Sequence, residues 1–354
     1  MIEFCSPTAD AHVEACCATG TSPGNRRNVS GFAPVSKTTF RAKIFFDHYG
    51  TVSVPIGFEE SGSVHLDPIL VLGGISATSH VCQNENDQAP GWWKDVVGRG
   101  LSIDPQHFRI IGIDYIGSPD LGWEPNWPIT TEDQARAVVA LLDRLKIERV
   151  TVVGASYGGM VGLALASSFP ERVRRAVIMC AAHRPHPMAT AVRAVQREIV
   201  CLGKSAGREA DGVALARALA MTTYRAAEEF ESRFSFRPKE PCDGTPVFPV
   251  EDYLRSRGRD FAAKFAAASF LRLSESIDLH EVEPARIEVP LDLLSVDSDV
   301  LAPPWLMQEL QEMAPDVRSH LTIRSIFGHD AFLKETGAVS DFLNDVLAVE
   351  GGVG

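Results

Sequence analysis

The sequence predicts an α/β fold, in which helices cover a mostly parallel sheet. Short runs rich in Val and Ile alternate with amphipathic helical segments from about residue 68 to residue 180, which is typical of such a sheet. The same alternation resumes near residue 287, after a long helical stretch. The 354 residues are 45% hydrophobic and 23% charged, so the chain has enough apolar material for one large core and an inserted subdomain.

Runs of apolar and β-branched residues define the first half of the expected sheet. The strands predicted there are 40–46, 51–55, 69–72, 108–113, 149–153 and 173–179. The first two of these predict an antiparallel hairpin, and the third ends at Gly73-Gly74. The acidic first turn and periodic apolar face of residues 131–145 predict an amphipathic helix. A further helical pattern begins near Met160.

A change of pattern predicts a helical lid inserted into the sheet. From about His183 to Glu283, Ala-rich and charged helical segments replace the strands. Beyond them the expected elements are strands 287–296 and 321–326 and helices 304–313 and 339–347. The predicted organisation is therefore a disordered tail over 1–35, a first part of the core over 36–182, the lid over 183–285, and a second part of the core over 286–354.

Charge and cysteine content exclude several classes of protein. The formal net charge of −12 opposes binding to nucleic acid or to an anionic membrane, because both favour clustered Lys and Arg. No stretch approaches the roughly eighteen unbroken apolar residues of a membrane span. The seven cysteines are scattered, and the pair Cys16-Cys17 has no third ligand nearby, so we expect reduced thiols in a soluble cytoplasmic protein and no metal site.

The run Gly154-Ala155-Ser156-Tyr157-Gly158 lies between a predicted strand and a predicted helix. This is the position of the nucleophile elbow of α/β-hydrolase folds, in which a tight turn exposes the serine at a helix N-terminus. A serine needs a base and an oxyanion site to act as a nucleophile at neutral pH. A plain glycine-rich turn is the alternative, and the flanking strand and helix favour Ser156 as the nucleophile of an acyl-transfer enzyme.

The remaining members of a catalytic triad are expected later in the chain, in the order acid and then histidine. His329 follows the last predicted strand, and Asp297 and Asp299 follow the strand that resumes after the lid. Either aspartate could reach the imidazole, and spacing alone does not choose between them. The backbone N–H groups of Tyr157 and Ile75 are the expected oxyanion donors, because one follows the nucleophile and the other follows Gly73-Gly74.

Several motifs resemble those of the homoserine O-acyltransferases, which have an α/β-hydrolase fold and a helical lid. They are Gly-His-Asp-Ala-Phe-Leu at 328–333, Pro-Gly-Trp-Trp at 90–93, Ser-Asp-Val-Leu at 298–301, Val-Gln-Arg at 195–197 and Thr-Tyr-Arg at 223–225. The resemblance covers roughly residues 40 to 345 and favours Asp299 as the acid. The segment between Arg197 and Tyr224 is short for the family, and the loop Gly-Gly-Ile-Ser-Ala departs from its usual Leu-Thr-Gly type.

The resemblance implies a reaction of methionine biosynthesis, transfer of an acetyl or succinyl group from acyl-CoA to L-homoserine. A ping-pong cycle through Ser156 is implied, with acyl-CoA as co-substrate, no other cofactor, and a homodimer. Arg197 is expected to bind the carboxylate of the amino-acid substrate and Asp330 its ammonium group. Tyr224 is a further candidate substrate-binding residue. The alternatives without a substrate role are a solvated side chain for Arg197, a helix cap at Asp330, and a packing role for Tyr224.

Other functions remain open at this point. An esterase or thioesterase shares every triad residue and differs in using water as the acceptor. An acyltransferase acting on L-serine or on another hydroxyl is a second alternative, and a non-catalytic binding module with the same fold is a third. The shortened lid resembles a subgroup often assigned succinyl transfer, but no residue that recognises a succinyl carboxylate can be identified from the chain.

Overall fold

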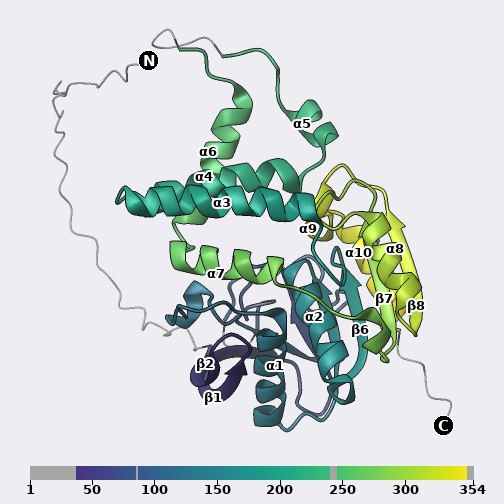
Figure 1. Ribbon diagram of the computed structural model, residues 1–354. Coiled ribbons are helices and arrows are strands. Elements are labelled where there is room, and N and C mark those ends of the chain that lie inside the picture. The colour runs from purple at the N-terminus through teal and green to yellow at the C-terminus, as the bar shows by residue number, and fades with distance from the viewer. Residues whose placement is uncertain (1–36, 85–86, 240–244, 349–354) are drawn as a thin grey trace, which may run out of the picture. The chain divides into compact units, whose positions relative to one another are not determined.

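A computed structural model describes residues 37–84, 87–239 and 245–348, which belong to one compact unit. Its centre is an eight-stranded sheet with the order β1-β2-β4-β3-β5-β6-β7-β8 (Figure 1). The strands are β1 Thr38–Phe46, β2 Gly50–Ser61, β3 Asp67–Leu72, β4 Phe108–Ile113, β5 Val150–Ala155, β6 Val173–Met179, β7 Leu291–Val296 and β8 Val317–Ile323. The pairings β1–β2 and β2–β4 are antiparallel, and all the others are parallel. The predicted α/β class is confirmed.

Helices cover both faces of this sheet. The helices of the core are α1 Thr131–Leu145, α2 Tyr157–Ser168, α8 Pro304–Met313, α9 Ala331–Lys334 and α10 Thr336–Leu347. Apolar residues of α1, α2 and α8 form one buried cluster with one set of strand side chains, and residues of α10 form a second cluster with the alternate set. Because side chains alternate along a strand, each buried strand contributes to both clusters.

Four predicted elements coincide with observed ones, and the others differ at one or both ends. The strand predicted over 51–55 extends over Gly50–Ser61 as β2. The predicted ranges 108–113, 131–145, 173–179 and 304–313 coincide with β4, α1, β6 and α8. The prediction of strand 321–326 was wrong at both ends, because β8 pairs with β7 over 317–323 through partly exposed polar residues at the edge of the sheet. The strand predicted from residue 287 begins at Leu291, after Pro290, which cannot donate a ladder hydrogen bond.

The segment between β6 and β7 is helical, as predicted for a lid over 183–285. Its helices are α3 Pro187–Ser205, α4 Glu209–Tyr224, α5 Ala227–Arg233, α6 Pro249–Ala262 and α7 Ala267–Asp278. Helix α4 packs against α3, α6 and α7, and Figure 1 shows α7 between the other lid helices and the sheet. Single-turn 3-10 helices complete the secondary structure at Pro119–Leu121, Pro170–Arg172, Pro284–Arg286 and Gly328–Asp330.

Two further sequence predictions concern features outside the core. The predicted tail over 1–35, with Cys16-Cys17, lies outside the described residues. Cys82, Cys180 and Cys201 are free thiols. Within the described part of the chain, every helix is too short or too polar to cross a membrane.

Candidate active site

Ser156 occupies a sharp turn between β5 and α2. Its backbone has φ 56° and ψ −125°, a strained conformation for a residue with a side chain and one that functional sites retain. A Cβ on Gly154 or on Gly158 would collide with neighbouring backbone atoms, so the turn requires glycine at both positions. The predicted elbow is confirmed, except that the helix begins at Tyr157 rather than near Met160.

Ser156, His329 and Asp299 form a continuous hydrogen-bonded chain. The Ser156 Oγ lies 2.8 Å from His329 Nε2, and His329 Nδ1 lies 2.7 Å from Asp299 Oδ2. His329 belongs to the 3-10 turn after β8, and Asp299 follows β7. The carboxyl ends of three parallel strands thus bring the three side chains together, in the geometry of a nucleophile, a base and an orienting acid.

The structure distinguishes the two candidate acids. The Asp299 carboxylate is buried, and its Oδ1 accepts hydrogen bonds from the N–H groups of Leu301 and Ala302. The Oδ1 of Asp297 accepts a hydrogen bond from the N–H of Ser325, in the loop after β8. Asp299 therefore contacts the imidazole, while Asp297 connects the loop after β7 with the loop after β8.

The environment of His329 changes its proton affinity. Burial lowers the pKa of the imidazole, but the charge and hydrogen bond of Asp299, together with the charge of Asp330, outweigh burial and raise this pKa above its usual value. The raised pKa reflects stabilisation of the imidazolium form. A base that takes a proton from a serine needs this stabilisation.

Ser156 and His329 line an inner cavity of about 180 Å³ between the sheet and the lid. The loop after β3 forms one wall, because a Cβ on Gly74 would lie 3.9 Å from Ser156 Oγ. The loop is held in place at Gly73, whose carbonyl oxygen accepts hydrogen bonds from the Tyr115 hydroxyl and the Gly158 N–H. Ile75 and Tyr157 both line the inner cavity, and their oxyanion role stays a prediction.

Tyr157 also joins the elbow to the lid. Its side chain is buried, and its hydroxyl lies 2.7 Å from Ser276 Oγ on α7 and accepts a hydrogen bond from Gln134 on α1. Burial raises the pKa of this phenol. The hydroxyl therefore stays protonated and serves as a structural link between core and lid.

Two of the three predicted substrate-binding residues line the inner cavity. Asp330 and Tyr224 are both at its wall, and the Tyr224 ring centroid lies 6.0 Å from that of His329. Arg225 Nε lies 3.0 Å from Asp330 Oδ2. The Asp330 carboxylate is thus held beside the histidine by a neighbouring arginine.

The third predicted residue, Arg197, is not among the residues that line either described cavity. Arg193, one turn earlier on α3, lines the inner cavity instead. Both guanidinium groups lie 2.6 Å from the Asp278 carboxylate of α7, and Arg197 also donates to Ser274 Oγ. Residues one turn apart share a helix face, so the helical pattern alone could not show which arginine reaches the cavity.

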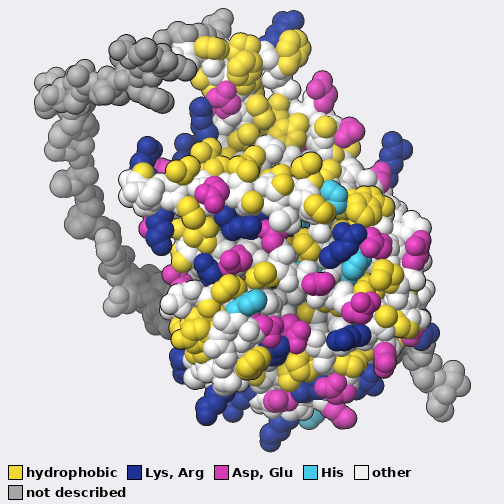
Figure 2. Space-filling view, viewed as in Figure 1, with side chains coloured by type: hydrophobic (Ala, Val, Ile, Leu, Met, Phe, Trp, Pro, Cys, Tyr) yellow, Lys and Arg dark blue, Asp and Glu magenta, His cyan; other side chains and the backbone are white. Residues whose placement is uncertain are grey.

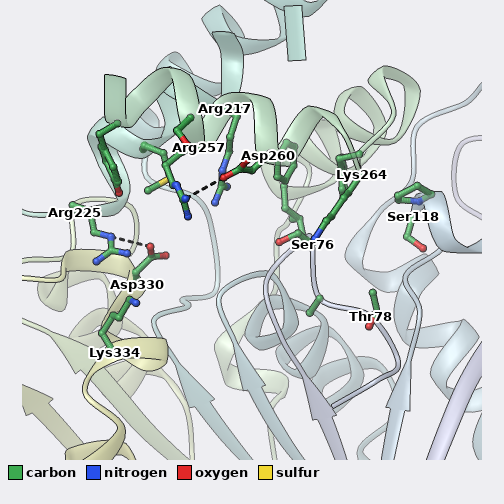
Figure 3. Close-up of a pocket in the computed structure, with 18 of the residues that line it drawn as sticks. Ser76, Thr78, Ser118, Arg217, Arg225, Arg257, Asp260, Lys264, Asp330 and Lys334 are labelled. Carbon is green, nitrogen blue, oxygen red and sulfur yellow. Dashed lines mark ion pairs between the residues drawn. The ribbon is translucent and has the colours of Figure 1, made fainter. Parts of the chain in front are cut away.

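A larger outer cavity of about 890 Å³ adjoins the inner one (Figure 3). Its walls come from the loop after β3, from the lid helices and from the region after His329. Its lining has more cations than carboxylates. The cations are Arg217, Arg225, Arg233, Arg257, Lys264 and Lys334, and the carboxylates are Asp120, Asp252, Asp260 and Asp330. This cluster of cations was not predicted from the sequence, because its members are spread along a chain of negative net charge. The one feature of the sequence that could have indicated the cluster is the high arginine content of the lid.

Metal ligands do not cluster in the part of the chain that the structure describes, where no group of three or more His, Cys, Asp or Glu side chains is suitably arranged. The expectation that the protein needs no cofactor besides acyl-CoA stays a prediction.

Comparisons with known proteins show the family of the chain. A family model described as alpha/beta hydrolase fold matches residues 67–199. A homoserine O-succinyltransferase of Xanthomonas campestris pv. campestris is 39% identical over 305 residues, covering 86% of this chain and 82% of that protein. The chain belongs to the homoserine O-acyltransferase family. Another relative is a homoserine O-acetyltransferase of Thermus thermophilus. It is 31% identical over 341 residues, and the match covers 86% of each chain.

Several solved structures share the fold of this chain. A homoserine O-acetyltransferase from Bacillus anthracis superposes with a TM-score of 0.76 at 20% identity, over 87% of this chain and 97% of that one. Esterase E22 superposes with a TM-score of 0.77 at 22% identity, over 88% and 99% of the two chains. At these identities the superpositions show the fold alone, which transferases and esterases have in common.

Proposed function

We propose that the protein transfers an acyl group from acyl-CoA to the hydroxyl of L-homoserine through an acyl-enzyme on Ser156. The observation that carries this proposal is that Ser156 and His329, the nucleophile and base of the triad, line one cavity together with Arg193 and Asp330. A hydrolase needs the triad and its oxyanion donors, but no charged groups that bind an amino acid. An arginine and a carboxylate beside the triad suit the two charged groups of an amino acid.

In the first half-reaction Ser156 attacks the acyl-CoA. His329 Nε2 accepts the Ser156 proton as Oγ bonds to the thioester carbonyl carbon, and Asp299 stabilises the imidazolium. The carbon–sulfur bond then breaks, the proton passes from His329 to the leaving thiolate, and the acyl group remains on Oγ. The N–H groups of Tyr157 and Ile75 are the proposed donors to the oxyanion, where each such donor contributes about 3 kcal/mol.

In the second half-reaction the hydroxyl of L-homoserine replaces water as the nucleophile. His329 accepts its proton while the oxygen bonds to the acyl carbon, and the Ser156 oxygen leaves and recovers the proton. Arg193 and Arg197 place two positive charges on the single Asp278 carboxylate, which leaves net positive charge for the substrate carboxylate. The ammonium group is assigned to Asp330. The Oδ2 of this carboxylate contacts Arg225, and its other oxygen can accept a hydrogen bond from the ammonium group.

The outer cavity suits the CoA moiety. Its cations Arg233, Arg257, Lys264 and Lys334 can bind phosphate groups, although the whole chain is acidic. Ile75, Ser76 and Ala77 line both cavities. A thioester could therefore extend from the phosphates in the outer cavity to Ser156 in the inner one.

We also propose a homodimer formed through the lid. Met188, Val195 and Leu202 lie at seven-residue intervals along α3 and are 66%, 53% and 68% exposed. Figure 2 shows hydrophobic side chains along this helix. An exposed apolar stripe of this kind marks an interaction surface, and light scattering of the purified chain tests the dimer. The free thiols Cys82, Cys180 and Cys201 support the further proposal of a reducing, cytoplasmic location.

Thiol release tests the proposed reaction. Acetyl-CoA and succinyl-CoA are each supplied with L-homoserine, with L-serine, or without an acceptor, and free CoA is measured. The proposal predicts steady turnover with L-homoserine and only a single-turnover burst without an acceptor. Turnover that is equally fast without an amino acid would establish a thioesterase, and faster turnover with L-serine would reassign the acceptor.

A further inference from the structure

Arg217 lies where the inner and outer cavities meet. It is half-buried on α4 and lines both of them. Figure 3 shows its side chain descending from the lid into the cavity. The other residues that line both cavities are Ile75, Ser76, Ala77, Phe261 and Asp330. Arg217 is therefore the cation at this junction within the described chain.

Two aromatic rings hold the Arg217 side chain. Its guanidinium carbon lies 4.8 Å from the centroid of the Tyr224 ring and 4.8 Å from that of Phe261. The Tyr224 ring in turn lies 6.0 Å from the His329 ring, so two ring contacts in series connect the guanidinium with the triad. Contact through the face of a guanidinium leaves its N–H groups, which lie in the plane, available to a ligand.

Arg217 differs from nearby arginines in having no carboxylate partner within the described residues. Arg193 pairs with Asp278 in the inner cavity. In the outer cavity Arg225 pairs with Asp330 and Glu229, and Arg257 with Asp260, as the dashed lines of Figure 3 mark for the pairs drawn there. The positive charge of Arg217 is thus left for a bound anion.

The two candidate acyl groups differ in the one feature that such a cation can recognise. A succinyl group carries a distal carboxylate two methylene groups from the reacting carbonyl, and an acetyl group carries none. A carboxylate enclosed beside Ser156 without a cation would lose its hydration without compensation, whereas a guanidinium fork binds it through two hydrogen bonds. The inner cavity also contains apolar walls such as Trp92, Met160 and Phe332, which do not compensate a charge.

We propose that Arg217 selects the acyl donor by binding the distal carboxylate of a succinyl group, so that the protein uses succinyl-CoA in preference to acetyl-CoA. This inference rests on the proposed acyl transfer. Arg217 is a specificity-determining residue in this account and takes no part in bond breaking. With an acetyl donor its guanidinium keeps its contacts with the Tyr224 and Phe261 rings.

The test compares kcat/KM for succinyl-CoA, butyryl-CoA and acetyl-CoA in the wild type and in Arg217→Met. Butyryl-CoA resembles succinyl-CoA but lacks the distal charge, and Met can keep the contact with the two rings. The ratio of succinyl to butyryl kcat/KM should fall by about a hundredfold in Arg217→Met, since one partner of an enclosed charge pair is removed. Arg217→Lys, which keeps the charge, should recover part of the ratio.

Arg257→Met is the matched control. Arg257 also comes from the lid, but it lines the outer cavity without reaching the inner one. Its loss should lower kcat/KM for all three donors by a common factor and leave their ratios unchanged. Thermal unfolding of each variant verifies that the fold is retained.

The outcomes separate this inference from the proposed function. A selective loss of succinyl transfer in Arg217→Met supports the role of Arg217. An unchanged succinyl to butyryl ratio overturns it, as does a wild type that prefers acetyl-CoA while still acylating L-homoserine. A wild type that transfers no acyl group from any donor to L-homoserine contradicts the proposed function itself.

Discussion

The core and the lid contribute different parts of the candidate site. The core supplies the triad, whose members follow β5, β7 and β8 and are placed by the pairing of neighbouring strands. The lid supplies Arg193 and Arg217, which extend from helices toward the cavity. On the proposed function, the core performs the bond chemistry, which hydrolases of this fold share, and supplies Asp330 for the ammonium group of the acceptor. The lid supplies the cations proposed to select the acyl group and to bind the carboxylate of the acceptor.

Replacing Ser156 by Ala should have the largest effect, because it removes the nucleophile and leaves the cavity unchanged. We expect kcat to fall by about a million-fold, with binding of CoA retained. Steady-state CoA release measures the rate, and calorimetry measures the binding. A variant that kept more than a few per cent of wild-type turnover would show that the core does not supply the nucleophile at this position.

Asp299→Asn should lower kcat by about ten-thousand-fold, because an amide cannot stabilise the imidazolium or fix the required tautomer of His329. Asp297→Asn is the matched control. It keeps an oxygen that can accept the hydrogen bond from the Ser325 N–H, so its kcat should stay within a few-fold of the wild type. Equal losses in the two variants would contradict the assignment of Asp299 as the orienting acid.

Arg193→Met should test the lid without disturbing the core. We expect KM for L-homoserine to rise by about a hundredfold, since a charged hydrogen-bonding partner of the substrate carboxylate is lost. The burst of CoA release without acceptor should keep its rate. Arg197→Met, one turn away and outside the cavity lining, should raise KM by a smaller factor. A larger rise of KM in Arg197→Met than in Arg193→Met would instead assign the substrate contact to Arg197.

The pH dependence of kcat/KM should show the smallest effect and report mainly on the core. His329 must be neutral to accept a proton, and Asp299 raises its pKa above the usual value of about 6.5. Activity should therefore fall about tenfold per pH unit below an apparent pKa that lies above 6.5. In Asp299→Asn this acidic limb should move to lower pH. A limb that Asp299→Asn leaves in place would belong to another group.

The same contrast explains what the sequence could predict. Apolar patterns in the sequence predict buried strands, and the carboxyl ends of parallel strands lie at one edge of the sheet. The residues that follow β5, β7 and β8 could therefore be predicted to form a site. The polar edge strand β8 was misplaced because its pattern is partly exposed. In the lid, helical periodicity predicts which face of a helix is buried, but it does not predict which turn of the helix faces the cavity. Arg197 was predicted from the resemblance of Val195-Gln196-Arg197 to a lid motif of the family, whereas Arg193, one turn earlier, lines the inner cavity.

Arg217 could not be recognised from the sequence for a related reason. An arginine on a helix is most often solvated, and although Tyr224 follows two turns later on α4, nothing in the sequence indicates that the Phe261 ring also contacts the Arg217 guanidinium. Phe261 belongs to α6, and the packing of α4 against α6 brings the two together. Selectivity that arises from helix packing is visible only in the folded molecule.

Mass spectrometry of the intact protein tests most directly the claim that the core forms an acyl-enzyme and the lid directs its transfer. The protein is mixed with succinyl-CoA in the absence of an acceptor, and L-homoserine is then added. The account predicts one succinyl group on the peptide that contains Ser156, which disappears on addition of L-homoserine as O-succinylhomoserine is formed. Succinylation of another residue, or an adduct that water removes as fast as L-homoserine does, would contradict it.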